Sequence, residues 1–211
     1  MAEEARARTE RKPPTLVVVS RKPVEDSGAF GIPSISKIAV KRIVRGKPAG
    51  RIVTLFEKNY PSPGAGFAQH SVRVYSRLKE LGMRVPTTYR LVEFREGWPS
   101  ILQTDLTFKG KSLVTPAIGP GQPNQGIIRR IRNWDEVVGQ MRNDVQKAAE
   151  HGMLLNKDEW MISVDKKTGK AQVYLTDFDR TVMRGKPDLE SDLAALDKWK
   201  AEMERVRKAR R

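Results

Sequence analysis

The chain has 211 residues, of which 38% are hydrophobic, so it is long enough to bury the core of one large domain or two small ones. It contains no cysteine, which excludes disulfides and thiolate zinc sites, and no apolar run reaches the roughly 18–20 residues that cross a bilayer. Forty Lys and Arg against 25 Asp and Glu give a net charge of +15, which favours phosphate-bearing or acidic partners. We therefore expect a soluble, cytoplasmic protein without a membrane span.

The first half of the chain alternates between strand and turn patterns. Residues 1–14 are charged, end in two prolines and predict a mobile basic tail. Residues 15–20 are β-branched, and the apolar stretches 35–45 and 50–59 flank a Gly- and Pro-containing turn, which predicts three antiparallel strands. After them, apolar residues from Phe67 to Leu81 recur at helical spacing, and Gly82 is placed to end that helix.

A second hairpin, 87–94 with 100–107, precedes a change of pattern. Residues 108–125 are rich in glycine and proline and predict a connection without regular structure. The apolar face of 133–150 predicts a long helix, which Asn133 and Glu136 start in the manner of a capping box. A third hairpin, 159–165 with 171–178, and a C-terminal helix from about Leu189 complete the order.

Four short motifs accompany this order of elements: "GAFG" at 28–31, "IAVK" at 38–41, "HGMLLNKDEWMISVD" at 151–165 and "TDFD" at 176–179. Together they resemble the protein-kinase-like superfamily. The resemblance implies a bilobal α+β fold with an antiparallel N-lobe sheet and one helix over residues 15–107. A hinge at 108–125 would then lead to a small, mainly helical C-lobe over 126–211 that ends in the C-terminal helix.

The resemblance also implies a nucleotide site between the lobes, with ATP and Mg²⁺ as cofactors. Gly28 and Gly31 would form the glycine-rich loop that approaches the phosphates. The phosphate-pairing lysine belongs on the third strand, which favours Lys58, whereas the literal match in "IAVK" offers Lys41. Family members hold this lysine with a glutamate from the next helix, but the inward positions near the start of that helix carry Gln69, His70 and Ser71.

Two registers of the catalytic loop are open. Counting back from Asp177 places Asp158 at the position of the catalytic base and Ser163 at that of the metal-binding asparagine. Matching the turn of the third hairpin instead places Asn156 and Met161 at those two positions. The first register keeps a base and weakens one metal ligand, and the second loses both.

The tripeptide after the last strand carries the remaining site residues. In the family its first aspartate holds magnesium against the phosphates, so Asp177 is the principal metal candidate and Asp179 a second one. The competing interpretation is that Asp177 only caps a strand end and pairs with a neighbouring cation.

Three functions are compatible with these patterns. The first is an ATP-dependent phosphotransferase that acts on an unknown protein or small molecule. The second is a pseudokinase that binds without efficient chemistry, which the altered catalytic loop favours. The third is a basic nucleic-acid-binding or ribonucleoprotein component, which the net charge and the basic C-terminus favour. Other chemistries find little support, because two histidines and no cysteine cannot build a Cys–His nucleophile or a His-rich metal site.

Overall fold

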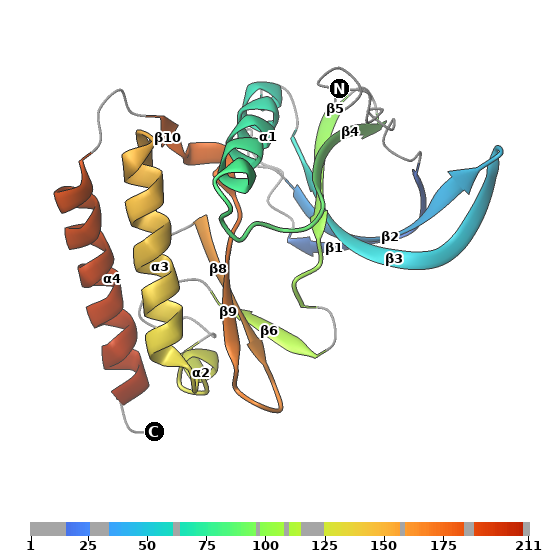
Figure 1. Cartoon of the computed structure of the whole chain (residues 1–211). Helices are drawn as coiled ribbons and strands as arrows, with labels where there is room; N and C mark the ends of the chain where they lie inside the picture. The colour runs from blue at the N-terminus through green and yellow to red at the C-terminus, as the bar shows by residue number, and fades with distance from the viewer. Residues whose placement is uncertain are drawn as a thin grey trace, which may run out of the picture.

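The computed structural model describes residues 16–25, 34–60, 64–95, 98–107, 110–114, 125–156, 159–183 and 188–208 (Figure 1). In this part of the chain the fold is mixed α+β, with a five-stranded antiparallel sheet and four α-helices. The expected basic tail at 1–14 and most of the expected connection at 108–125 lie outside the described residues. No helix among the described residues is long and apolar enough to cross a membrane.

The larger sheet contains the first five strands in the order β1-β2-β3-β5-β4. Their bounds are β1 Leu16–Glu25, β2 Ser34–Val44, β3 Lys47–Asn59, β4 Tyr89–Arg95 and β5 Trp98–Thr104. Every neighbouring pair is antiparallel, which confirms the three opening strands and the second hairpin. Their β-branched and alternating residues suit a pleated surface that is buried on one side.

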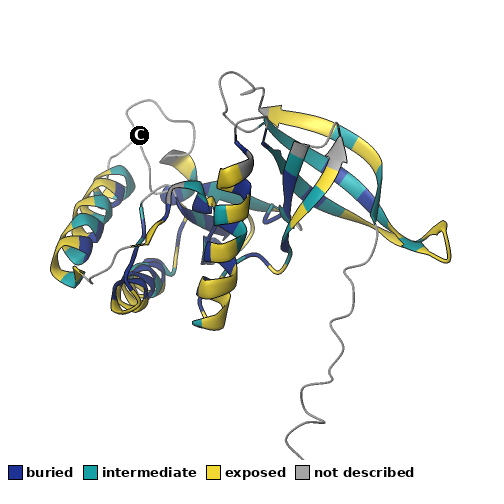
Figure 2. Ribbon diagram, turned by 90° about the horizontal axis from the view of Figure 1, so that it is seen from above, coloured by how far each residue is buried: buried dark blue, intermediate teal, exposed yellow. Residues whose placement is uncertain are grey.

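The turn between β2 and β3 differs from the expected one. The sequence places it at 46–49, but Val44 pairs with Lys47 and the turn is Arg45-Gly46. Both turn residues have positive φ, 50° and 76°, as the two-residue hairpin turn that matches strand twist requires. Pro48 and Gly50 therefore belong to β3, and the far ends of β2 and β3 extend away from the rest of the fold as an exposed ribbon (Figures 1 and 2).

The remaining elements form a second group. They are α1 (Ala65–Glu80), α2 (Gln125–Ile128), α3 (Trp134–Glu150), α4 (Leu189–Lys208), a three-stranded sheet in the order β6-β8-β9 (Lys111–Val114, Trp160–Asp165, Ala171–Leu175), the short pair β7 (Met153–Leu154) and β10 (Val182–Met183), and the 3₁₀ turn η2 (Phe178–Arg180). Strand β6 lies inside the segment that the sequence predicts to be irregular. A strand of four residues is not stable by itself, and pairing with β8 provides its backbone hydrogen bonds.

The ends of two helices show how far local patterns predict structure. Gly82, with a φ of 70°, follows the C-terminus of α1 as expected, and the N–H of Met83 donates to the carbonyl of Leu78. Asn133 is the N-cap residue of α3 as expected, but it makes no side-chain hydrogen bond to the backbone of the first turn. Its side-chain amide donates to the Glu136 carboxylate at 2.9 Å, and its side chain also pairs with both backbone groups of Ala171 in β9.

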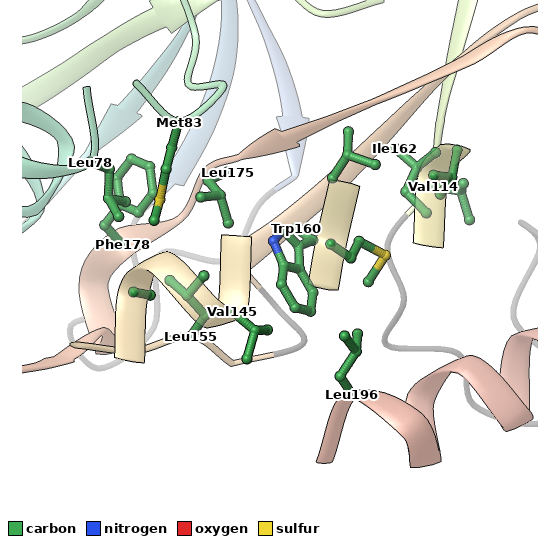
Figure 3. Close-up of a cluster of buried hydrophobic side chains, with 14 of the residues drawn as sticks. Leu78, Met83, Val114, Val145, Leu155, Trp160, Ile162, Leu175, Phe178 and Leu196 are labelled. Atoms are coloured by element: carbon green, nitrogen blue, oxygen red, sulfur yellow. The ribbon is translucent and has the colours of Figure 1, made fainter. Parts of the chain in front are cut away.

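Two hydrophobic clusters support these elements. The larger one joins α1, α3 and α4 to β8 and β9, and Figure 3 shows its members around Trp160 and Phe178, both fully buried. The smaller one is confined to the large sheet and consists of Ile38, Val40, Leu55 and Leu102. Phe67, expected on the inward face of α1, is instead 54% exposed, and the buried face of the helix consists of Ala68, Ser71, Val74, Tyr75 and Leu78.

Candidate functional site

Lys58 lies at the centre of a polar cluster that joins the end of β3 to the segment after β9. Its Nζ donates to Oδ1 of Asp177 and, at 2.5 Å, to Oδ2 of Asp179. The lysine side chain is 15% exposed, so one ammonium is largely removed from water between two carboxylates. The structure thus brings together Lys58, Asp177 and Asp179, all of which the sequence singles out. The two aspartates follow Lys58 in the chain by 119 and 121 positions.

The local backbone explains why both aspartates face the same cation. Strand β9 ends at Leu175, and Asp177 adopts a left-handed conformation with φ 55° and ψ 54°. A short polar side chain tolerates this region better than most residues. The chain then turns through η2, whose middle residue is Asp179, while Phe178 points into the core against Tyr89, with ring centroids 5.2 Å apart. The packing of Phe178 therefore fixes the position of the tripeptide.

Asp179 is the structural member of the carboxylate pair. Besides Lys58 it accepts hydrogen bonds from the hydroxyls of Tyr60 at 2.5 Å and Ser71 at 2.6 Å. Burial opposes its ionisation, but the charge of Lys58 and these hydrogen bonds outweigh burial and lower its pKa. Ser71 stands on α1, where the sequence lacks the expected glutamate. Asp179 supplies the carboxylate for Lys58 from another element, and Ser71 ties that carboxylate to the helix.

Asp177 has a different environment. Its side chain is half exposed, and among the described residues its carboxylate pairs with Lys58. A carboxylate oxygen that faces solvent beside an ammonium can exchange that partner for a hard cation, because Mg²⁺ binds through one or two carboxylates and keeps several waters. Among the described residues no group of three or more His, Asp or Glu side chains gathers as a metal cage.

Glu159 is a buried acid near this site that the sequence analysis did not select. It is 1% exposed, accepts a hydrogen bond from Oγ1 of Thr181 at 2.7 Å and another from the Asn156 N–H at 3.0 Å. Burial raises its pKa to about 7, and the nearby charge of Asp177 adds to the effect. A signal was present in the sequence: a glutamate that opens an otherwise apolar strand has to be buried with a partner.

The other candidates from the catalytic loop lie apart from Lys58 or outside the described residues. Ser163 is buried in β8, its hydroxyl donates to the carbonyl of Leu106 at 3.0 Å, and it pairs with Gln172. Gln172 precedes Asp177 by five residues, about 17 Å along an extended chain. Met161 also lies within β8. Asn156 is nearer, through its backbone contact with Glu159. Asp158 lies outside the described residues.

Of the residues of the large sheet that are expected to contact phosphate, one lies beside the aspartates and the others lie away from them or outside the described residues. Lys41 lies opposite Val17 in β1, and Ile35 is the residue of β2 opposite Lys58. Six residues of extended strand, about 20 Å, separate Lys41 from that position. The structure therefore places Lys58, and not Lys41, beside the aspartates. Gly28 and Gly31 lie outside the described residues.

Comparisons with known proteins add little to this geometry. No model of a protein family matches the chain, and no curated protein matches it significantly. Among solved structures the chain is similar to one titled "Crystal structure of Cex1p", with 10% sequence identity and a TM-score of 0.40. The match covers 87% of this chain and 30% of that one, and a similarity of this degree carries no argument about fold or function.

Proposed function

We propose that this chain is a kinase-like protein that binds ATP with Mg²⁺ and acts through binding, as a pseudokinase. The observation that carries the proposal is the position of Lys58 between a half-exposed and a buried aspartate at the end of the large sheet. A cation held in place by one acid, with a second acid open to solvent, can accept an anion and a metal ion together. A bilobal arrangement is part of this proposal, with β6, inside the expected connection at 108–125, paired to β8 in the C-terminal group.

Each residue has a distinct task in the bound state. Asp179, supported by Tyr60 and Ser71, holds the Lys58 ammonium where a phosphate group can reach it. Asp177 provides the carboxylate oxygen that a magnesium ion would bind. Magnesium would neutralise phosphate charge when bound. Lys58 can exchange Asp177 for a phosphate without becoming unpaired, because Asp179 remains its partner.

The absence of efficient transfer follows from the residues around the catalytic loop. The Ser163 hydroxyl is occupied by the Leu106 carbonyl inside the sheet, so the register that uses Ser163 as a metal ligand gains no support. The other register places Asn156 and Met161 at the two positions, and neither side chain is a general base. An acceptor substrate would then bind, if at all, without being phosphorylated.

A thermal-shift titration with ATP and MgCl₂ tests the binding. At ATP about tenfold above its Kd the free energy of unfolding should rise by about 1.4 kcal/mol, which raises Tm by roughly 3–6 °C. Asp177→Asn should remove the magnesium-dependent part of the shift, whereas Asp135→Asn, an exposed acid on α3, should leave it unchanged. A wild-type protein whose Tm does not respond to ATP and Mg²⁺ would refute the proposal.

A second assay separates binding from transfer. Incubation with γ-labelled ATP and a panel of protein and small-molecule acceptors should give no labelled product above the level of an Asp158→Asn variant. Labelling that wild type performs and Asp158→Asn abolishes would show an active phosphotransferase and would refute the pseudokinase assignment, while leaving ATP binding intact.

A further inference from the structure

A groove of about 690 Å³ lies on the large sheet, away from Lys58 and both aspartates. It is bounded by the β2–β3 ribbon, the C-terminal part of α1 and the start of β4. The lining residues are Leu16, Val40, Arg42, Ala49, Gly50, Arg51, Val53, Leu55, Tyr75, Lys79, Thr87, Thr88, Tyr89 and Arg90. The volume lies within the range of pockets that enclose specific ligands.

A bulge in β3 bends the ribbon at this groove. Val40 pairs with Val53 and Arg42 with Ala49, so one residue of β2 stands opposite the three residues 50–52 of β3. Gly50 has a φ of 80° and open space around its Cα, as a bulge position requires. A bulged strand bends and twists locally, and this bend positions the cations of the ribbon at the rim of the groove.

The rim of the groove carries one sign of charge. Arg42 and Arg51 from the ribbon, Lys79 from α1 and Arg90 from β4 line it, and among the residues that the structure describes no Asp or Glu does. Arg42, Arg51 and Lys79 are exposed, and within the described part of the chain no ion pair to a carboxylate involves Arg42 or Arg51. The three exposed cations come from three elements, β2, β3 and α1, and so favour a ligand whose negative charges are spread along its length.

The floor of the groove is aliphatic. Val40 and Leu55 belong to the smaller hydrophobic cluster of the large sheet. Val53 lies beside them and is 41% exposed, so the groove has uncovered apolar surface inside a cationic rim. The two aromatic residues, Tyr75 and Tyr89, are each 6% exposed and stack on one another with centroids 4.8 Å apart. Among the described residues that line this groove no ring face is open for stacking a nucleobase, which is how single strands are usually held.

We infer that this groove docks an acidic amphipathic peptide segment of a partner protein, whose apolar side chains cover Val53 and whose carboxylates meet the exposed cations Arg42, Arg51 and Lys79. Charge complementarity selects this occupant. The chain's own residues 1–14 carry four cations and three carboxylates, so they do not match a cationic rim. The inference is independent of the proposed nucleotide site, because the groove contains none of its residues.

Fluorescence anisotropy with a labelled peptide tests the inference. The probe is a helix-forming peptide of about 15 residues, about 22 Å long, with leucines on one face and glutamates on the other. A peptide of the same composition in scrambled order controls for charge alone. At about 0.15 M salt the amphipathic peptide should bind the full chain at least about tenfold more tightly than the scrambled one, a difference of about 1.4 kcal/mol.

Two charge-matched double variants locate the binding. Arg42→Glu with Arg51→Glu should weaken binding by at least about tenfold, whereas Lys166→Glu with Lys167→Glu, in the exposed β8–β9 turn, should weaken it less than about threefold. Both pairs are exposed, so both variants should fold, which circular dichroism verifies. Val53→Ser should also weaken binding, because it removes exposed apolar surface from the floor of the groove.

Several results would overturn the inference. Equal loss in the two double variants would mean that net charge alone attracts the peptide. Tighter binding of a single-stranded RNA of equal charge, lost in the Arg42→Glu, Arg51→Glu variant, would assign the groove to nucleic acid. A rise of about tenfold or more in peptide affinity on deletion of residues 1–14 would assign it to the tail. Absence of any peptide binding would also refute it.

Discussion

The carboxylates of Asp177 and Asp179 share one cation, yet removing each charge should have a different consequence. Asp179 is buried and also accepts from Tyr60 and Ser71, so Asp179→Asn leaves Lys58 and two hydroxyls poorly matched. We expect this change to lower the free energy of unfolding by about 2–4 kcal/mol, somewhat less than the roughly 3–5 kcal/mol of a fully broken buried pair, because Lys58 keeps Asp177. Asp177→Asn, half exposed, should cost about 0–1 kcal/mol. Urea unfolding measures both, and equal losses would contradict the division of roles.

Glu159 should make the stability of the protein fall between about pH 4.5 and pH 7. Its pKa is about 7 in the fold against an ordinary value of 4.5, so the folded state binds a proton that the unfolded state has released. The stabilisation is complete below pH 4.5 and is lost as the pH rises through 7, by about 3 kcal/mol in all. Burial also raises the pKa of Asp144, to about 6, so that residue adds to the decline at lower pH.

The variant Glu159→Gln isolates this contribution. The amide keeps an oxygen acceptor for Thr181 but cannot ionise, so unfolding free energies measured from pH 4.5 to pH 8 should decline less than in wild type. The decline that Asp144 causes should remain below about pH 6. A variant as pH-dependent as wild type above pH 6 would show that Glu159 titrates near its ordinary value.

At the scale of elements, Asn133 attaches the start of α3 to strand β9. Its side-chain carbonyl accepts from the Ala171 N–H at 2.7 Å, and its amide donates to the Ala171 carbonyl at 3.0 Å. Asn133→Ala should therefore cost about 1–3 kcal/mol, since two backbone groups lose their partner.

The matched control is Asn133→Asp made together with Glu136→Gln, since the Asn133 amide also donates to the Glu136 carboxylate and two carboxylates would repel. The aspartate can still cap the helix but cannot donate to the Ala171 carbonyl. This variant should still be less stable than the wild type when stability is measured by thermal or urea unfolding. Full recovery of stability with aspartate would show that capping, and not attachment to β9, is the role of this residue.

Elements with a strong period were predictable from the sequence, and features set by distant partners were not. The apolar spacing in α1 and α3 and the alternation in β2 and β3 identify those elements, because each buries one face. Strand β6 carries no such signal, since its stability comes from pairing with β8, and the sequence does not show that Ala171 lies beside Asn133. In the site, Lys58 and Asp177 were predicted together, whereas the anchoring role of Asp179 depends on Tyr60 and Ser71, which only tertiary structure brings close.

At the scale of the whole molecule, the two hydrophobic clusters predict unequal local stability. The larger one includes α1 together with the C-terminal elements, while four buried residues form the smaller one in the large sheet. Less buried apolar surface means a smaller free energy of opening. Amide hydrogen exchange should therefore be faster in β2 around Val40 than in β8 around Ile162.

Two core truncations give the comparison. Leu55→Ala, in the small cluster, should speed exchange in β1–β3 and leave β8 nearly unchanged, whereas Val145→Ala, in the large cluster, should affect β8 and β9. Equal acceleration in all strands after either change would show that the clusters open as one unit.

The long separation between Lys58 and Asp179 also has a consequence for the protein while it is being made. The strand that carries Lys58 leaves the ribosome 121 residues before its anchoring acid, a delay of roughly 6–24 s at about 5–20 residues per second. During that interval the first strands can pair, but the lysine, Tyr60 and Ser71 have no carboxylate to hold. A fragment that ends before residue 179 lacks the anchoring carboxylate, so the cluster forms only in a chain whose synthesis has passed that point.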